Sequence, residues 1–218
     1  LADSVMGALL PKVWEEFAVK HGVIPGSKFA VVAMGKLGAR EMTAGSDLDL
    51  VFLYDVPNDG TVGSGGGATS DGATPLAETA YFARLGQRFI SALTARTSEG
   101  SLYEVDMRLR PSGASGPIAS SVDGWARYQV ENAWTFEHMA LTRARVVAGP
   151  ETLAAEIAER TRAILCTKRD WDGLVHDVAT MRTKMETEHG STNPWRVKYV
   201  RGGLIDVEFI SQALQLRH

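Results

Sequence analysis

Hydrophobic and polar residues follow patterns in the first half of the chain that predict both helices and strands. An apolar residue at every third or fourth position predicts a helix over residues 3–21. Continuous apolar runs at residues 29–34 and 48–54 predict two buried strands, with a turn and short helix at 35–42 between them. A third strand is predicted at residues 102–110, where apolar and charged side chains alternate. Together these segments predict a small sheet with helices beside it.

The remainder of the chain has mostly the spacing of helices. A proline suited to a first helical turn starts a predicted helix over residues 75–96. From residue 121 to about residue 189 the pattern predicts several helical segments, with breaks at 149–150 and near 167–170. Two glycines then precede a last predicted helix at residues 204–218. The second half is therefore expected to be helical.

These elements predict an α+β chain made of two packed parts. A domain with a mixed sheet flanked by helices is expected at residues 1–120, followed by a helical bundle at residues 121–218. Residues 58–74 are rich in Gly, Ser, Thr and Asp, which predicts a mobile connecting loop. Its glycines lack the spacing and the Lys-Ser/Thr pair of a phosphate-binding loop, so a plain connection is the favoured interpretation.

Composition and charge narrow the classes of function. With 23 basic and 26 acidic residues the formal net charge is -3, which gives no bias toward nucleic acid or an anionic membrane. No apolar run approaches the ~18 residues that a membrane span needs, and no signal peptide is visible. The single cysteine, Cys166, excludes an internal disulfide and is expected to be a packed thiol in a reducing cytosol. Because the chain starts with Leu1 and stops within a predicted helix at His218, we expect it to be a piece of a longer protein.

Two carboxylates at the start of the second predicted strand give the strongest chemical signal. Asp47 and Asp49 are two residues apart, so on a strand they leave on the same face, with Cα atoms roughly 6.5–7 Å apart. That spacing suits two carboxylates that bind two Mg²⁺ ions about 3.5–4 Å apart. The alternative is a solvated turn in which Asp47 caps the backbone, and the apolar strands and the Gly45-Ser46 pair around it weaken that alternative. These residues favour metal-assisted phosphoryl or nucleotidyl transfer.

A third acidic residue and several polar ones could complete such a site. If the third predicted strand lies beside the second, Asp106 becomes a third carboxylate, with Arg108 and Arg110 on the same face. A cross-strand salt bridge is the alternative for Asp106. Further candidates for binding a triphosphate are two cations after the first strand and the glycine and serine before the carboxylates: Lys36, Arg40, Gly45 and Ser46. An ordinary solvated helix face is the alternative for the two cations.

Two other groups of residues have both a structural and a functional interpretation. Four residues share one predicted helical stripe: Trp134, His138, Leu141 and Arg145. Packing against the sheet is favoured for the apolar members, and a core histidine with satisfied hydrogen bonds is favoured for His138. A zinc site is not expected, because no cysteine or second histidine has ligand spacing. Asp206 and Glu208 at the start of the last helix could offset the helix dipole or line an active site.

These motifs together resemble the bacterial glutamine synthetase adenylyltransferases, also called glutamate–ammonia ligase adenylyltransferases. The matching stretches are residues 35–38, 45–55, 103–113, 133–147 and 202–209. The Asp-x-Asp pair alone would indicate only the nucleotidyltransferase superfamily with the polymerase-β-like fold. The sequence around the three aspartates is more similar to the C-terminal, AMP-transferring half of the family than to the AMP-removing half. The stretch Met107-Arg-Leu-Arg110 is typical of either half.

The resemblance implies a cytoplasmic enzyme that transfers AMP from ATP to a tyrosine of glutamine synthetase. It implies a polymerase-β-like domain followed by a helical bundle, with Asp47 and Asp49 as Mg²⁺ ligands and Asp106 completing the site near the attacking tyrosine. Expected partners are glutamine synthetase and, through the full-length protein, a PII signalling protein, but neither nucleic acid nor membrane. The alternatives are phosphorolytic removal of AMP, a catalytically idle partner-binding domain, and transfer to RNA or an antibiotic.

Overall fold

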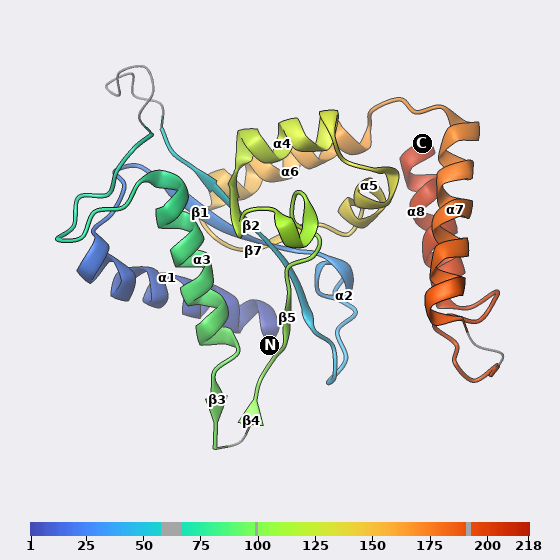
Figure 1. Cartoon of the computed structure of the whole chain (residues 1–218), viewed down its shortest axis with the longest axis horizontal. Helices are drawn as coiled ribbons and strands as arrows, with labels where there is room; N and C mark the ends of the chain where they lie inside the picture. The colour runs from blue at the N-terminus through green and yellow to red at the C-terminus, as the bar shows by residue number, and fades with distance from the viewer. Residues whose placement is uncertain (58–66, 99, 191–192) are drawn as a thin grey trace.

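Figure 1 shows the computed structural model, which describes residues 1–57, 67–98, 100–190 and 193–218. The helices are α1 (Ala2–His21), α2 (Gly35–Gly38), α3 (Glu78–Leu93), α4 (Val122–Glu131), α5 (Thr135–Leu141), α6 (Glu151–Leu165), α7 (Trp171–His189) and α8 (Leu204–Arg217). The strands are β1 (Lys28–Ala33), β2 (Leu48–Asp55), β3 (Arg96–Thr97), β4 (Gly100–Ser101), β5 (Val105–Asp106), β6 (Ala119–Ser121) and β7 (Arg145–Ala148). Across the described residues, none of the helices is both long and apolar enough to cross a lipid bilayer.

Strand β2 lies at the centre of a mixed sheet. Strand β1 runs antiparallel to it, and β7 adds antiparallel to the other edge of β1. On its opposite side β2 pairs in parallel with β5 near its start and with β6 toward its end. A separate hairpin joins β3 and β4. The mixed sheet flanked by helices that the sequence predicts is therefore confirmed.

Helices cover both faces of this sheet, α1 and α3 on one face and α4 and α6 on the other (Figure 1). Successive residues of β1 divide between the two layers, since Phe29 packs with the first pair of helices and Ala30 with the second. On the first face the rings of Tyr54 and Phe82 stack with centroids 4.1 Å apart. Burial on both faces explains why β1 and β2 are continuous apolar runs, and it makes them a rigid support for the residues at their ends.

Helices α5, α7 and α8 form a third layer at one end of the sheet (Figure 1). Its apolar cluster is built around Met139, Leu174 and Phe209. The prediction that residues 121–189 are helical, with breaks only at 149–150 and near 167–170, is wrong at β7, because Val146 and Val147 are β-branched and extend the sheet on β1. The sheet thus takes a strand from the part expected to be helical, and the division of the chain at residue 120 stays a prediction.

The glycine-rich segment lies partly outside the described residues, which leave out 58–66. Its second part, 67–74, is hydrogen-bonded to the end of α1, where the N–H of Gly72 donates to the carbonyl of His21 (3.1 Å). A Cβ on Gly72 would lie 2.1 Å from the carbonyl carbon of His21, so only glycine fits this approach. Residues 67–74 are therefore hydrogen-bonded to α1, and the mobility expected of 58–74 stays a prediction. The helix predicted after it is confirmed as α3, with shorter ends.

Candidate active site

Three aspartates meet at the edge of the sheet where β2 begins. Asp47 directly precedes β2, Asp49 is its second residue, and Asp106 ends β5. Strand β5 places Asp106 opposite Asp49, and the N–H of Leu48 donates to the carbonyl of Glu104 (2.8 Å). Oxygens of the three carboxylates all lie within 4.8 Å of one another. The structure thus brings together the three carboxylates that the sequence singles out.

Strand β5 is much shorter than the strand predicted at residues 102–110. The carboxylate of Asp106 accepts a hydrogen bond from the backbone N–H of Arg108 (2.8 Å), and the N–H of Arg110 donates to the carbonyl of Met107 (3.2 Å). These local hydrogen bonds replace the sheet ladder and turn the chain away from β2. The prediction that Asp106, Arg108 and Arg110 share one strand face is therefore wrong.

The two arginines after Asp106 have different surroundings. The Arg108 side chain is exposed, and its Nε donates to the carboxylate of Asp106 (2.7 Å), so its charge lies beside the aspartates. Arg110 instead closes its own loop by donating to three backbone carbonyls. These belong to Met107, Ala114 and Gly116. The charges of both arginines lower the pKa of Asp106, but of the two it is Arg108 that pairs with this carboxylate directly and could meet a phosphate there.

Gly35 at the start of α2 provides the space that Asp49 occupies. Its φ of 49° lies in the left-handed region, and a Cβ there would lie 2.2 Å from Oδ2 of Asp49. The N–H of Met34 donates to the backbone carbonyl of Asp49 (2.9 Å), which ties the two segments together. A glycine is required here for both its backbone conformation and this close approach. The Gly-Lys-Leu-Gly segment thus reverses the chain after β1 and leaves room for the Asp49 side chain.

The carboxylates repel one another electrostatically. Burial, followed by the charges of Asp47 and Asp106, raises the pKa of Asp49 to about 6. Hydrogen bonds from Arg108 lower the pKa of Asp106. Three clustered carboxylate oxygens are the ligands that hard divalent cations prefer, and a cation would relieve the repulsion around Asp49. The residues present therefore fit a divalent metal ion.

The other predicted phosphate-binding residues have mixed surroundings. Ser46 is buried, and its N–H donates to the carbonyl of Thr43 (3.0 Å) while its hydroxyl bonds the Thr43 hydroxyl (2.9 Å). The pKa of Asp3 is lowered chiefly by a hydrogen bond from Arg145 and further by the charge of Arg40, so Arg40 acts on the start of α1. Three of these candidates are exposed to solvent: Lys36, Arg40 and Gly45. Ser46 is therefore fixed in a turn by its hydrogen bonds to Thr43. The charge of Arg40 acts on Asp3 at the start of α1.

Lys198, in the connection between α7 and α8, was missed by the sequence reasoning. Its charge lowers the pKa of Asp49, opposing in small part the rise that burial causes. The exposed Lys198 ammonium lies 4.9 Å from the ring centroid of Tyr199. No pattern in the sequence links a lysine in a loop to carboxylates some 150 positions earlier.

The predicted stripe at residues 134–145 does not form one helix. Trp134 precedes α5 and is 39% exposed, so the expected packing against the sheet is wrong for it, whereas Leu141 is buried in the core. His138 makes a 2.8 Å hydrogen bond to the carbonyl of Gln129, and burial lowers its pKa. This environment agrees with a satisfied core histidine. Arg145 lies in β7 and binds Asp3.

The acidic residues of α8 and the cysteine can also be placed. Asp206 is bound by Arg182 of α7, and Glu208 lies 3.3 Å from the guanidinium of Arg143. Both are therefore engaged in ion pairs between elements. Cys166 follows the last residue of α6 and is exposed, so the expectation of a packed thiol is wrong.

Comparisons with known proteins agree on one family. The family model described as glutamate–ammonia ligase adenylyltransferase matches residues 1–160. Proteins named bifunctional glutamine synthetase adenylyltransferase/adenylyl-removing enzyme match over the whole chain, with 49% identity in Xanthobacter autotrophicus and Bradyrhizobium diazoefficiens and 47% in Rhodopseudomonas palustris. The chain spans about a fifth of the length of these relatives, since it covers 21% of each.

Proposed function

The chain belongs to the glutamate–ammonia ligase adenylyltransferase family. From that premise we propose that its three aspartates form the centre that transfers AMP from ATP to a tyrosine of glutamine synthetase. The observation that carries the proposal is the meeting of three carboxylates, with oxygens within 4.8 Å of one another, at the end of a rigid sheet. Such a cluster is suited to polyphosphate chemistry assisted by divalent cations. The proposal includes a cytoplasmic location and regulation by a PII signalling protein through the rest of the polypeptide.

Each aspartate has a proposed role. Asp47, Asp49 and Asp106 would hold two Mg²⁺ ions, which when bound would neutralise phosphate charge and make the attacking hydroxyl more acidic. Gly35 leaves room for the Asp49 carboxylate, and Arg108 balances charge beside Asp106. Because Arg108 lowers the pKa of Asp106, a role for Asp106 in accepting the tyrosine proton requires Arg108 to release it.

Phosphorolytic removal of AMP from modified glutamine synthetase is the second candidate. The names of the relatives combine the transferring and removing activities, and this chain spans about a fifth of their length. The same three carboxylates could serve either direction, since both pass AMP between a tyrosine and a phosphate group. A catalytically idle regulatory domain is disfavoured, because all three carboxylates are present and gathered.

The test combines this chain with unmodified glutamine synthetase, Mg²⁺ and ATP labelled at the α-phosphate. We expect label on the synthetase with the wild-type chain and with Asp55→Asn at the far end of β2, but none with Asp47→Asn. In the second arm the chain meets adenylylated synthetase and phosphate. Release of AMP as ADP there, without label transfer in the first arm, would assign the removing activity instead. Equal label with Asp47→Asn and wild type would refute the proposed centre.

A further inference from the structure

A cleft of about 510 Å³ runs between α6 and the edge of the sheet that β7 forms. One wall is the face of α6 on which Ala154, Ala158 and Leu165 lie, and Val146 of β7 belongs to the other wall. Alanine side chains are small, so they leave open a space that larger residues would fill. The volume and the mostly apolar walls are those of a small-molecule site. None of the three aspartates lines the cleft, so it is separate from the aspartate centre.

Two of the polar residues in the walls already have partners within the protein. The hydroxyl of Thr142 donates to the carbonyl of Met139 (2.7 Å). The guanidinium of Arg145 binds Asp3 and donates to two backbone carbonyls of α2. These two side chains therefore serve the fold, and a molecule in the cleft would have to bind other polar groups.

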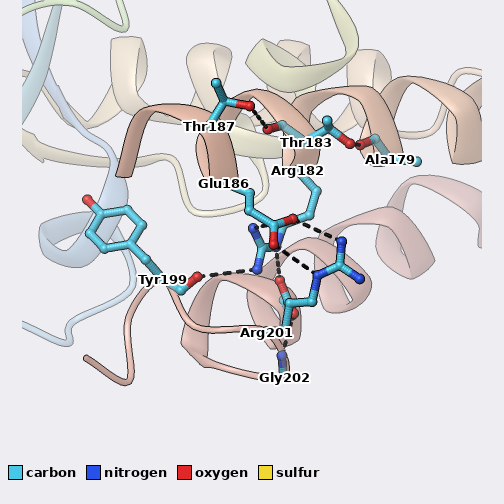
Figure 2. Close-up of polar contacts among 9 residues, drawn as sticks. Ala179, Arg182, Thr183, Glu186, Thr187, Tyr199, Arg201 and Gly202 are labelled. Atoms are coloured by element: carbon cyan, nitrogen blue, oxygen red, sulfur yellow. Dashed lines mark hydrogen bonds and ion pairs between the residues drawn. The ribbon is translucent and has the colours of Figure 1, made fainter. Parts of the chain in front are cut away.

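The hydroxyl of Thr161 lacks the partner that threonines in helices usually have. Thr183 and Thr187 of α7 each donate to the backbone carbonyl four residues earlier, at 2.9 and 3.0 Å (Figure 2). Among the described residues no group bonds the hydroxyl of Thr161, although this residue is only 9% exposed. Thr161 lies in the wall of the cleft, on the same face of α6 as Ala158. A buried hydroxyl without a partner costs free energy, and a molecule bound in the cleft would supply the missing hydrogen bond.

Arg162 brings an unpaired positive charge to the rim of the cleft. In the region of α7 and α8, by contrast, Arg182 and Arg201 both lie beside Glu186, at 3.9 and 3.0 Å (Figure 2). Within the described part of the chain no carboxylate pairs with the exposed guanidinium of Arg162. The residues that line the cleft include no carboxylate either. Since a guanidinium with free N–H donors matches the geometry of a carboxylate, the rim is suited to an anion.

We propose that this cleft binds a small molecule with an apolar body and one carboxylate. The apolar body would lie along Ala158 and Leu165, and the carboxylate would accept hydrogen bonds from Arg162 and Thr161. One unpaired cation above apolar walls fits a single negative charge better than it fits a polyphosphate. Cys166 is exposed and also lines the cleft, so a bound molecule would shield its thiol. The inference does not depend on the proposed function, because the aspartates take no part in it.

The first test uses octanoate as the probe and the single cysteine as the reporter. We expect octanoate to slow the reaction of Cys166 with a thiol reagent in a saturable way, and calorimetry to give the same Kd. Because each buried CH₂ adds apolar contact, Kd should fall about 3- to 4-fold per CH₂ from hexanoate to octanoate. Filling the cleft with Ala158→Phe should abolish the protection. Ala155→Phe, on an exposed part of α6 outside the cleft, should leave it unchanged. Absence of protection in the wild type, or protection undiminished by Ala158→Phe, would overturn the inference.

The second test examines the polar end of the cleft. Arg162→Gln should raise the Kd of octanoate about 3- to 10-fold, whereas Lys168→Gln, which removes an exposed charge outside the cleft, should not change it. Thr161→Val keeps nearly the same shape without the hydroxyl, and should raise Kd about 3-fold or more. Octanol has the same chain without the charge, so it should bind wild type and Arg162→Gln equally.

Two results would contradict the assignment of a carboxylate ligand. The first is an equal effect of Arg162→Gln on octanoate and on octanol. The second is protection of Cys166 that grows with protein concentration when no carboxylate is present, because it would mean that a second copy of the chain occupies the cleft. Urea unfolding of each variant separates these effects from loss of the fold.

Discussion

Replacing Asp49 by Asn is expected to make the metal-free protein more stable at neutral and alkaline pH. Asp49 is partly buried between two other carboxylates, Asp47 and Asp106, and its pKa is raised to about 6. Asn has nearly the same shape but no charge, so it removes the repulsion and keeps the packing against Gly35. The gain in stability measures how strongly the site disfavours its own charge when no cation is bound.

The size and the pH dependence of the gain follow from the pKa. A rise from 3.8 to about 6 corresponds to about 3 kcal/mol before screening, and contact with solvent reduces this to about 1–2 kcal/mol. The pKa of this acid is higher in the folded state, so the folded state binds more protons between about pH 4 and pH 6. The free energy of unfolding of the wild type therefore falls as pH rises through that window and stays at the lower value above it. The Asp49→Asn variant has no such decrease. The advantage of Asp49→Asn should be small at about pH 4 and complete above about pH 7.

Urea unfolding in EDTA at several pH values between about 4 and 8 measures this difference. Asp55→Asn is the matched control, because Asp55 lies at the other end of β2 and pairs with Lys28 (3.6 Å), so its loss should give no gain. Adding Mg²⁺ should stabilise the wild type more than Asp49→Asn. The reasoning is wrong if Asp49→Asn is no more stable than wild type at about pH 8, or if its advantage is the same at every pH.

Three further predictions concern the surroundings of the site and the rest of the chain. Gly35→Ala puts a Cβ against Asp49 at a left-handed φ, so it should lose transfer activity at least about 10-fold while unfolding shows a loss of about 1–2 kcal/mol; unchanged activity would contradict it. Arg145→Met removes the ion pair to Asp3 and two hydrogen bonds to α2 carbonyls, and should lower the free energy of unfolding by about 2–3 kcal/mol; a loss below about 0.5 kcal/mol in urea would argue against it. Cys166 should react with a thiol reagent in the native protein as completely as in urea, and protection in the native state would refute its exposure.

The sequence predicted the elements whose identity is set by burial. Strands β1 and β2 were recognisable because both faces of each are covered, which requires uninterrupted apolar runs. The pair Asp47 and Asp49 was recognisable for a related reason, since two like charges beside a buried run are costly unless a cation neutralises them. Asp106 could be placed beside them only if the third predicted strand paired with the second, which the sequence alone does not determine. The structure shows this pairing between β2 and β5.

What the sequence did not predict depends on contacts between distant residues or on local hydrogen bonds. The third strand stops at Asp106 because that side chain bonds the backbone of Arg108, a choice that alternation of apolar residues does not encode. Residues 145–148 join the sheet because β1 has an open edge to pair with, although the neighbouring sequence favours helix. The charge of Lys198 lowers the pKa of Asp49, although no local pattern in the sequence links these two distant residues. These are the places where tertiary contacts override local preference.

The central claim is that the aspartate centre transfers the nucleotidyl group of ATP, and it can be tested by the position of the label. The chain, glutamine synthetase and Mg²⁺ are incubated in parallel with ATP labelled at the α-phosphate and with ATP labelled at the γ-phosphate. We predict that label from the α position becomes attached to the synthetase, that label from the γ position is released as pyrophosphate, and that Asp106→Asn abolishes both. Attachment of the γ label to the synthetase, or attachment of the α label undiminished by Asp106→Asn, would contradict the account.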